Sequence, residues 1–323
     1  MCMKSVIVIL RRGLRQGWRA LVLEACATLV MATSAAAEVP AVVVSIKPIH
    51  SLVAAVMAGV GVPDLIVDGS VSLHDYALRP EDTERIAAAR LVFWIGPMLE
   101  TFLERPLARG TPRAEVVRLA DAPGVQLLQT RQGGGWGADA ADQDWSATRP
   151  GADGHIWLDP LNARRIVAAV TAALSGADPE HAPRYTRNAV DLYRRLDGLD
   201  AAFRPKLAPL AGKPFVVFHD AYQYFERRYT LKAVGAIVAG PGQSPSPRRL
   251  EEVRHRIRVS EVRCVFGEPQ VPAALMKSIT AETTVRTGTL DPEGIAIEAG
   301  PDLYFTLITG MVDELGKCLL RRD

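Results

Sequence analysis

Three of the six histidines stand where a metal-binding site would be expected. His74 lies in a predicted loop just past a strand, His155 follows a long loop, and His219 ends the apolar run 214–218. Open α/β sheets place their binding sites at the carboxyl ends of strands. Neutral imidazole nitrogens bind zinc, and three of them leave a fourth position for a carboxylate or a water. The placement predicts a three-histidine metal site.

The sequence leaves the identity of the fourth ligand open. Asp291, in the turn-rich segment 288–294, is our candidate, with a water or an open position as alternatives. A single histidine is more often a structural residue than a ligand, so the prediction depends on the joint placement of all three. The other three have ordinary explanations, as a half-buried helix residue or as solvated residues in charged helical stretches: His50, His181 and His255.

A three-histidine zinc with an open position also resembles a catalytic centre, in which bound water is acidified to near neutral pH. However, the sequence holds no His-Glu-x-x-His motif, no Gly-x-Ser-x-Gly turn and no His-x-His pair. A hydrolase would need Asp291 or Glu268 as its general base. We therefore expect no enzymatic activity and keep a zinc hydrolase as the less favoured alternative.

The elements that must position these residues follow an alternating pattern. Short β-branched runs alternate with helical periodicity, which favours βα units around mostly parallel sheets. The predicted strands are 41–46, 65–67, 91–95, 115–119, 215–218, 233–237 and 263–266. The predicted helices are 49–59, 81–89, 162–174, 221–228, 246–257 and 301–319.

Between the two halves lies a segment of different character. Across 179–208 apolar side chains recur at spacings of three and four without a strand signal, which predicts one long amphipathic helix that Pro205 ends. The chain is therefore predicted to fold as an α/β protein, with an N-terminal α/β lobe (38–178), a linking helix (179–208) and a C-terminal α/β lobe (209–323). A single larger α/β domain is the alternative. Segment 129–154, rich in Gly, Asp, Ala and Gln, is predicted to be a flexible surface loop.

Residues 1–37 have the features of a signal peptide. A basic stretch up to Arg19 precedes a short apolar run, and small residues at Ala35 and Ala37 suit cleavage before Glu38. A membrane anchor is the alternative, but the apolar run falls short of the ~20 residues that a spanning helix needs. Attachment of a lipid at Cys26 is a second alternative. We expect export to the periplasm.

Removal of this segment would leave two cysteines, Cys264 and Cys318. The periplasm is kept oxidising, so two cysteines in an exported protein favour one disulfide. Two separate buried thiols are the alternative.

Composition excludes one class of partner. The 323 residues are 48% apolar and 23% charged, which is ordinary for a globular protein. Residues 1–37 hold five of the 38 basic side chains and one of the 36 acidic ones, so the remainder carries a net charge near −2. Nucleic-acid binding needs clustered Lys and Arg, and we expect no nucleic-acid partner.

Six short motifs occur in order along nearly the whole predicted mature chain: Val-Ser-Ile-Lys-Pro-Ile-His-Ser-Leu-Val (44–53), His-Asp-Tyr-Ala-Leu-Arg-Pro (74–80), Leu-Val-Phe-Trp-Ile-Gly-Pro (91–97), His-Ile-Trp-Leu-Asp-Pro (155–160), Val-Phe-His-Asp-Ala-Tyr (217–222) and Cys-Val-Phe-Gly-Glu-Pro-Gln (264–270). Together they resemble the ZnuA-like family of periplasmic zinc-binding proteins of ABC importers. The resemblance implies two α/β lobes joined by a rigid helix, with the metal between them. It also implies zinc and the permease subunits as partners, in a monomer.

The resemblance further implies ligands at His74, His155 and His219, and a disulfide that joins Cys264 to Cys318. Two features depart from the family pattern. Many relatives carry a histidine-rich loop before the second ligand, whereas 129–154 contains no histidine, and some carry an acidic residue where this chain has Leu73.

Two further carboxylates, Asp220 and Glu268, are expected to orient ligands without binding metal themselves.

Three imidazoles favour zinc over manganese, which prefers more oxygen donors. A manganese- or iron-binding protein of the same fold is the alternative. Copper would bind such a site more tightly than zinc, so affinity alone does not identify the physiological metal. A surface adhesin would share the fold, but no feature of the sequence supports that function.

Overall fold

The computed structural model describes residues 39–69, 71–109, 113–131, 151–238, 245–281 and 283–321. These residues belong to one unit, Val39–Asp323. The predicted signal peptide and residues 132–150 of the predicted loop 129–154 lie outside the described residues. Within the described ranges, no helix is both long enough and apolar enough to cross a membrane.

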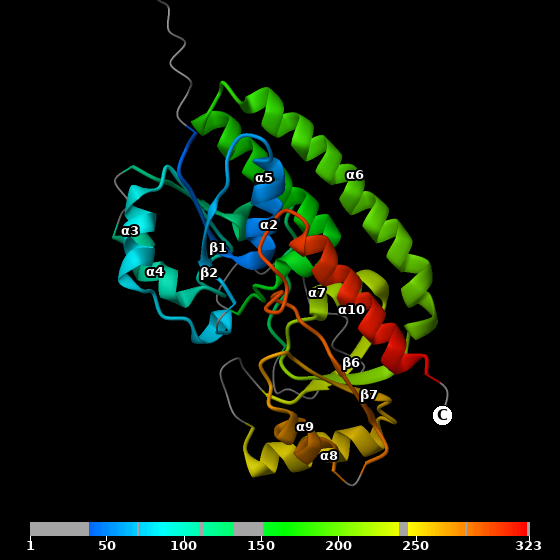
Figure 1. Cartoon of the computed structure of the whole chain (residues 1–323). Coiled ribbons are helices and arrows are strands. Elements are labelled where there is room, and N and C mark those ends of the chain that lie inside the picture. The colour runs from blue at the N-terminus through cyan, green and yellow to red at the C-terminus, as the bar shows by residue number, and fades with distance from the viewer. Residues whose placement is uncertain are drawn as a thin grey trace, which may run out of the picture. The chain divides into compact units, whose positions relative to one another are not determined.

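The first lobe is built around a parallel sheet in the order β2-β1-β3-β4 (Figure 1). Every side chain of its two central strands, β1 and β3, is buried, as expected for a parallel sheet with both faces covered. The strands are β1 (Val42–Ile46), β2 (Asp64–Val67), β3 (Leu91–Trp94) and β4 (Glu115–Arg118). The helices are α2 (Lys47–Val56), α3 (Pro80–Ala88), α4 (Thr101–Ala108) and α5 (Pro160–Ala177).

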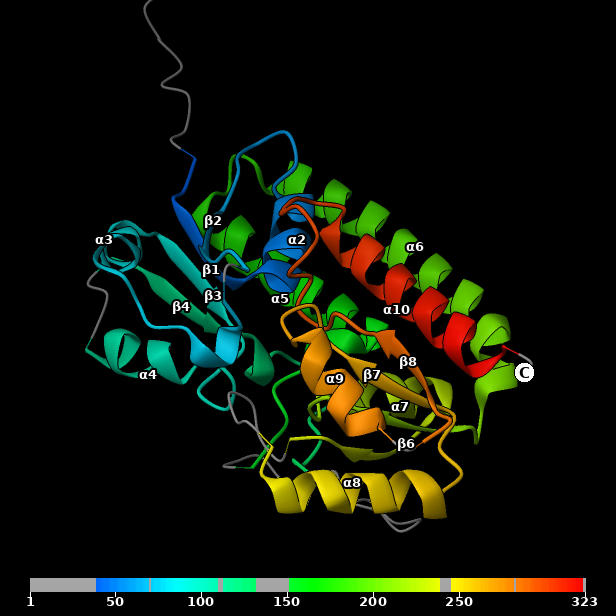
Figure 2. The same ribbon diagram turned by 60° about the horizontal axis from the view of Figure 1, so that its bottom comes forward.

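The second lobe repeats this arrangement with a parallel sheet in the order β6-β5-β7-β8. The strands are β5 (Pro214–Val217), β6 (Lys232–Ala236), β7 (Cys264–Gly267) and β8 (Arg286–Thr289). The helices are α7 (Gln223–Tyr229), α8 (Pro247–Val259), α9 (Ala273–Thr280) and α10 (Leu303–Leu319). Figure 2 shows α8 and α10 on opposite sides of this sheet. The prediction of an α/β fold with two parallel sheets is confirmed.

One long helix, α6 (Ala182–Leu207), stands between the two lobes in the sequence. It packs along α2 and α5 of the first lobe and along α10 of the second (Figure 1). The predicted amphipathic stripe forms its buried face: Tyr185, Ala189, Leu192, Leu196 and Phe203. The prediction that Pro205 ends the helix is wrong, because the helix continues to Leu207. The carbonyl oxygen of Ala201, to which the proline cannot donate, belongs to an exposed residue, so water can satisfy it.

The two lobes share one hydrophobic core. The largest cluster of buried apolar side chains includes residues from both sheets and from α6, while a smaller cluster lies beneath α8. Strands of the second sheet divide their side chains between the clusters, since Phe215 and Val217 join the large one and Val216 the small one. The side chain of Tyr304 in α10 also reaches the first lobe, where its hydroxyl donates to the carbonyl oxygen of Trp157 at 2.8 Å. The lobes are therefore joined by packing as well as by the chain.

The predicted disulfide is confirmed. Cys264 in β7 is bonded to Cys318 in α10, with Cα atoms 6.1 Å apart. The bond ties the last helix to a central strand of the second sheet.

Candidate metal centre

Each of the three predicted histidines is delivered by a short segment next to a regular element. His74 lies in the single 3-10 turn η1 (Leu73–Asp75), which follows β2. His155 directly precedes another such turn, η4 (Ile156–Leu158), ahead of α5. His219 comes two residues after the end of β5. Two histidines therefore belong to the first lobe and one to the second.

The three side chains converge. Among the described residues they form a group in which one nitrogen from each ring lies within 4.8 Å of the others. The Nε2 atoms of His155 and His219 are 3.4 Å apart. Two nitrogens bound tetrahedrally to zinc at about 2.05 Å would be roughly 3.3 Å apart. The Nε2 atom of His74 is buried and has no hydrogen-bond partner among the described residues, which leaves its lone pair available to a metal.

Carboxylates orient two of the three rings. The Nδ1 atom of His155 lies 2.7 Å from an oxygen of Asp153, and the Nδ1 atom of His219 lies 2.5 Å from an oxygen of Glu268. In each pair the carboxylate accepts a hydrogen bond from Nδ1–H, so each ring, when it is neutral, has its lone pair on Nε2, the atom that faces the cluster. These two imidazoles are thereby held in the tautomer that binds a metal.

Strand register explains why His219 meets Glu268. β5 and β7 are neighbours, with Phe215 opposite Cys264 and Val216 opposite Val265. The same register continued beyond the strand ends sets His219 opposite Glu268. The expectation that Glu268 orients a ligand therefore has a geometric basis in the sheet.

The histidines differ in their protonation. Burial, together with the neighbouring His155 and His219, lowers the pKa of His74 to about 2, so this imidazole is neutral. Burial by itself would lower the pKa of His219, but the adjacent Glu268 carboxylate raises it to about 9. A metal ion that binds His219 at neutral pH must therefore displace a proton.

The structure does not place Asp291 with the three histidines. Its carboxylate accepts hydrogen bonds from the backbone N–H groups of Glu293, Gly294 and Ala296, at 3.2, 2.7 and 3.2 Å, and so shapes its own turn. Asp291 as the fourth ligand stays a prediction.

Asp220, the other expected orienting residue, accepts hydrogen bonds from the Arg131 guanidinium. The same guanidinium also bonds to Glu226 of α7, so its buried charge is shared by two carboxylates.

Sequence reasoning missed two carboxylates, Asp153 and Glu293. Asp153 lies two residues before His155 in a segment without a periodic pattern. Glu293 is only 5% exposed, and its oxygens accept from the hydroxyl of Ser72 and the backbone N–H of Leu73, both at 3.1 Å. The one available signal for Glu293 was its place in the same acidic turn as Asp291.

The chain is similar to a family of known proteins. The model of the family described as the periplasmic component A of the zinc-uptake complex (ZnuA) matches residues 42–318. The high-affinity zinc uptake system protein ZnuA of Brucella abortus is 41% identical over 313 residues, covering 89% of this chain and 94% of that protein. Its namesake from Yersinia pestis is 31% identical, with 86% and 91% covered. The solved periplasmic zinc-binding protein TroA of Treponema pallidum matches with a TM-score of 0.74 at 22% identity, covering 88% of this chain and 100% of that chain.

Proposed function

The chain belongs to the ZnuA family of periplasmic zinc-uptake components, and from that membership we propose that it captures zinc between its two lobes and delivers it to the membrane permease of an ABC importer. The observation that carries the proposal is the convergence of three imidazole nitrogens from both lobes. Zinc is the cargo of this site.

Capture requires ligands that are ready to bind. His74 is neutral, and Asp153 and Glu268 hold the other two rings with Nε2 toward the cluster. Zinc would draw two ligands from the first lobe and His219 from the second, so a bound ion bridges the lobes. The fourth position would be filled by Asp291 or a water, or would stay open for release to the permease.

The choice of zinc follows from the donor atoms. Imidazole nitrogens suit zinc, whereas manganese prefers a site with more oxygen ligands. Glu268, one of the two carboxylates that a hydrolase could use as its base, is already engaged with His219 and Gln270. This arrangement supports capture of the ion rather than activation of a metal-bound water.

The place of action follows from the relatives and from the N-terminal segment. The family is described as periplasmic. Residues 1–37 would direct export and be cleaved before Glu38, and the mature monomer would then present its zinc-loaded surface to the permease subunits.

Zinc uptake by cells tests the proposal. In a bacterial strain that lacks its own copy of this protein, the wild-type chain should restore uptake of radioactive zinc from zinc-limited medium. A triple variant with His74→Ala, His155→Ala and His219→Ala should fail, whereas His181→Ala with His255→Ala should restore uptake. Restoration by the triple variant, or restored uptake of manganese but not zinc, would refute the proposed function.

A further inference from the structure

The two histidines of the first lobe share a local design. In each case the side chain two residues earlier accepts a hydrogen bond from the backbone N–H of the histidine. The carboxylate of Asp153 accepts from His155 at 2.9 Å, and the hydroxyl of Ser72 accepts from His74 at 3.4 Å. Short polar side chains stabilise turns in this way. The backbone position of each ligand is therefore set by one neighbouring side chain.

Both of these neighbouring side chains are held in turn by the second lobe. The amide of Gln223, the first residue of α7, donates to Asp153 at 2.7 Å. The carboxylate of Glu293 accepts from the Ser72 hydroxyl. Because that hydroxyl donates to Glu293 and accepts from His74, it joins the second lobe to the ligand in two steps. Gln223 and Asp153 form the same two-step link to His155.

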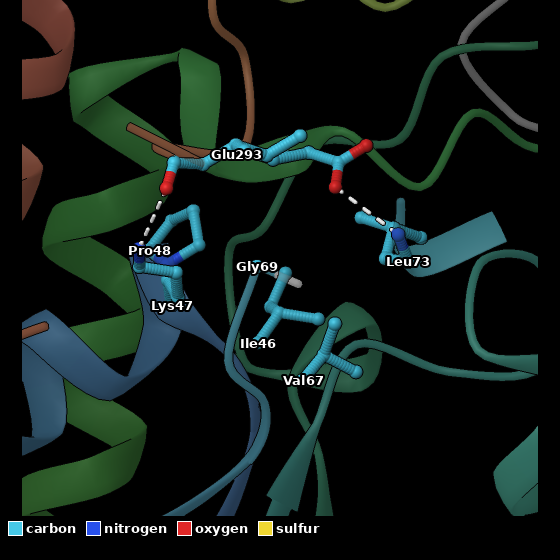
Figure 3. A pocket seen from close by; sticks show the side chains of 8 residues that line it. Ile46, Lys47, Pro48, Val67, Gly69, Leu73 and Glu293 are labelled. Carbon is cyan, nitrogen blue, oxygen red and sulfur yellow. Dashed lines mark hydrogen bonds between the residues drawn. The ribbon is translucent and has the colours of Figure 1, made fainter. Parts of the chain in front are cut away.

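The contacts of Glu293 form part of a tight junction between the lobes. Figure 3 shows the bond from the backbone nitrogen of Leu73 to Glu293 at a small cavity that Lys47 and Gly69 also line. The ammonium of Lys47 donates to the carbonyl oxygen of Ile295 at 3.2 Å, which ties the segment after Glu293 to the first lobe a second time.

Burial of the Glu293 carboxylate carries a desolvation penalty. A carboxylate that leaves water loses its hydration, and only hydrogen bonds or opposite charge offset that cost. An apolar side chain would fill the same space without that cost. Both oxygens of Glu293 instead accept from donors of the other lobe, directly before a metal ligand.

We propose that Glu293 and Gln223 are positioning residues for zinc, through which the second lobe sets the backbone of both first-lobe ligands before the ion arrives. This inference rests on the proposed function. Zinc affinity then depends on contacts across the lobe interface as well as on the three imidazoles. Residues that orient metal ligands in this indirect way typically change affinity by about 10- to 100-fold when they are replaced.

Double-mutant cycles on zinc affinity test the proposal, because residues that act through one another give non-additive effects. Glu293→Leu should weaken zinc binding of the mature protein by about 10- to 100-fold. In a His74→Ala background the same substitution should change affinity by less than about threefold, since no His74 side chain is left to position. Gln223→Leu should behave in the same way with His155→Ala. The crossed pair, Glu293→Leu with His155→Ala, should keep the full loss.

Additive losses in the matched pairs would overturn the proposal, because Glu293 would then act independently of His74, for example as a ligand. Glu293→Gln retains an oxygen for the Leu73 N–H group and should keep most of the affinity. Glu298→Leu, at an exposed position of the same segment, should leave affinity unchanged. If Glu293→Leu does not fold, Ser72→Ala is used in its place. It breaks the same link from the first-lobe side and should show the loss of zinc affinity expected of Glu293→Leu.

The proposed function and the positioning role are refuted by different outcomes. A wild-type chain without tight zinc binding would refute the proposed function. A wild-type chain that binds zinc tightly, together with Glu293→Leu and Gln223→Leu variants of equal affinity, would refute only the positioning role.

Discussion

The binding properties of the three histidines depend on the groups behind them. An imidazole can bind zinc through either nitrogen, and the hydrogen bond at the other nitrogen decides which one carries the lone pair. Asp153 and Glu268 make that choice for His155 and His219. The Nε2 atom of His74 is buried and has no hydrogen-bond partner among the described residues, so it is left available to a metal.

Replacing Glu268 should therefore weaken zinc binding without removing a ligand. We expect Glu268→Gln to lower zinc affinity by about 10- to 100-fold, because the neutral amide no longer raises the basicity of the His219 ring. Competition with a chelator of known zinc affinity measures the change. Glu251→Gln, at an exposed position in α8, is the control and should bind like the wild type. Equal affinities of Glu268→Gln and the control would contradict this role.

The sequence was sufficient to predict the three histidines as candidate ligands, since each follows or borders an element with a clear pattern. It was not sufficient to choose between the two acids of the turn at 291–293. Residue type makes both of them plausible ligands, but the backbone of the turn directs Asp291 to its own N–H groups and Glu293 to the other lobe. That choice depends on tertiary structure, which no local pattern encodes.

The regular elements were predictable where burial left a strong pattern. The central strands β1, β3, β5 and β7 consist mostly of β-branched and apolar residues, and each of them was predicted. β8 was missed because its sequence Arg-Thr-Gly-Thr has no apolar side chain, and it is a strand only because it pairs with β7. α4 was missed as well, and Pro106 lies inside it. α9 is a third omission, with only Ile279 buried.

The disulfide should stabilise the second lobe by restricting its unfolded chain. Cys264 and Cys318 are 54 positions apart, and closing a loop of that length contributes about 4 kcal/mol in the chain-entropy model. Cys264→Ser with Cys318→Ser should lower the free energy of unfolding by that order, as measured by urea denaturation. The oxidised mature chain from Glu38, which holds only Cys264 and Cys318, should also show no titratable thiol after denaturation. Two reactive thiols would contradict the bond, and an unchanged unfolding free energy would contradict its contribution.

The molecule as a whole joins its lobes in three ways. α6 packs on helices of both, α10 of the second lobe packs on α2 of the first, and the core is continuous between the sheets. The domain boundaries at 178 and 209 stay predictions, because this shared core gives no clean division. Such packing favours small movements between the lobes over a wide hinge opening.

Zinc that bridges the lobes should stabilise the folded protein. At a free zinc concentration 100 times the dissociation constant, binding to the folded state alone adds about 2.7 kcal/mol. The midpoint of thermal unfolding should rise accordingly with zinc and fall back after chelation. A His219→Ala variant should show a much smaller rise, because its second lobe no longer supplies a ligand. An equal rise in that variant would place the stabilising ion elsewhere.

Equilibrium zinc binding to the mature chain from Glu38, purified without an affinity tag, tests the ligand assignment most directly. We predict one tight equivalent of zinc that manganese does not displace. Binding should weaken sharply in His74→Ala, His155→Ala and His219→Ala and stay unchanged in His181→Ala and His255→Ala. Equal losses in all five variants, or a wild-type chain that prefers manganese, would contradict a zinc site made by three histidines from two lobes.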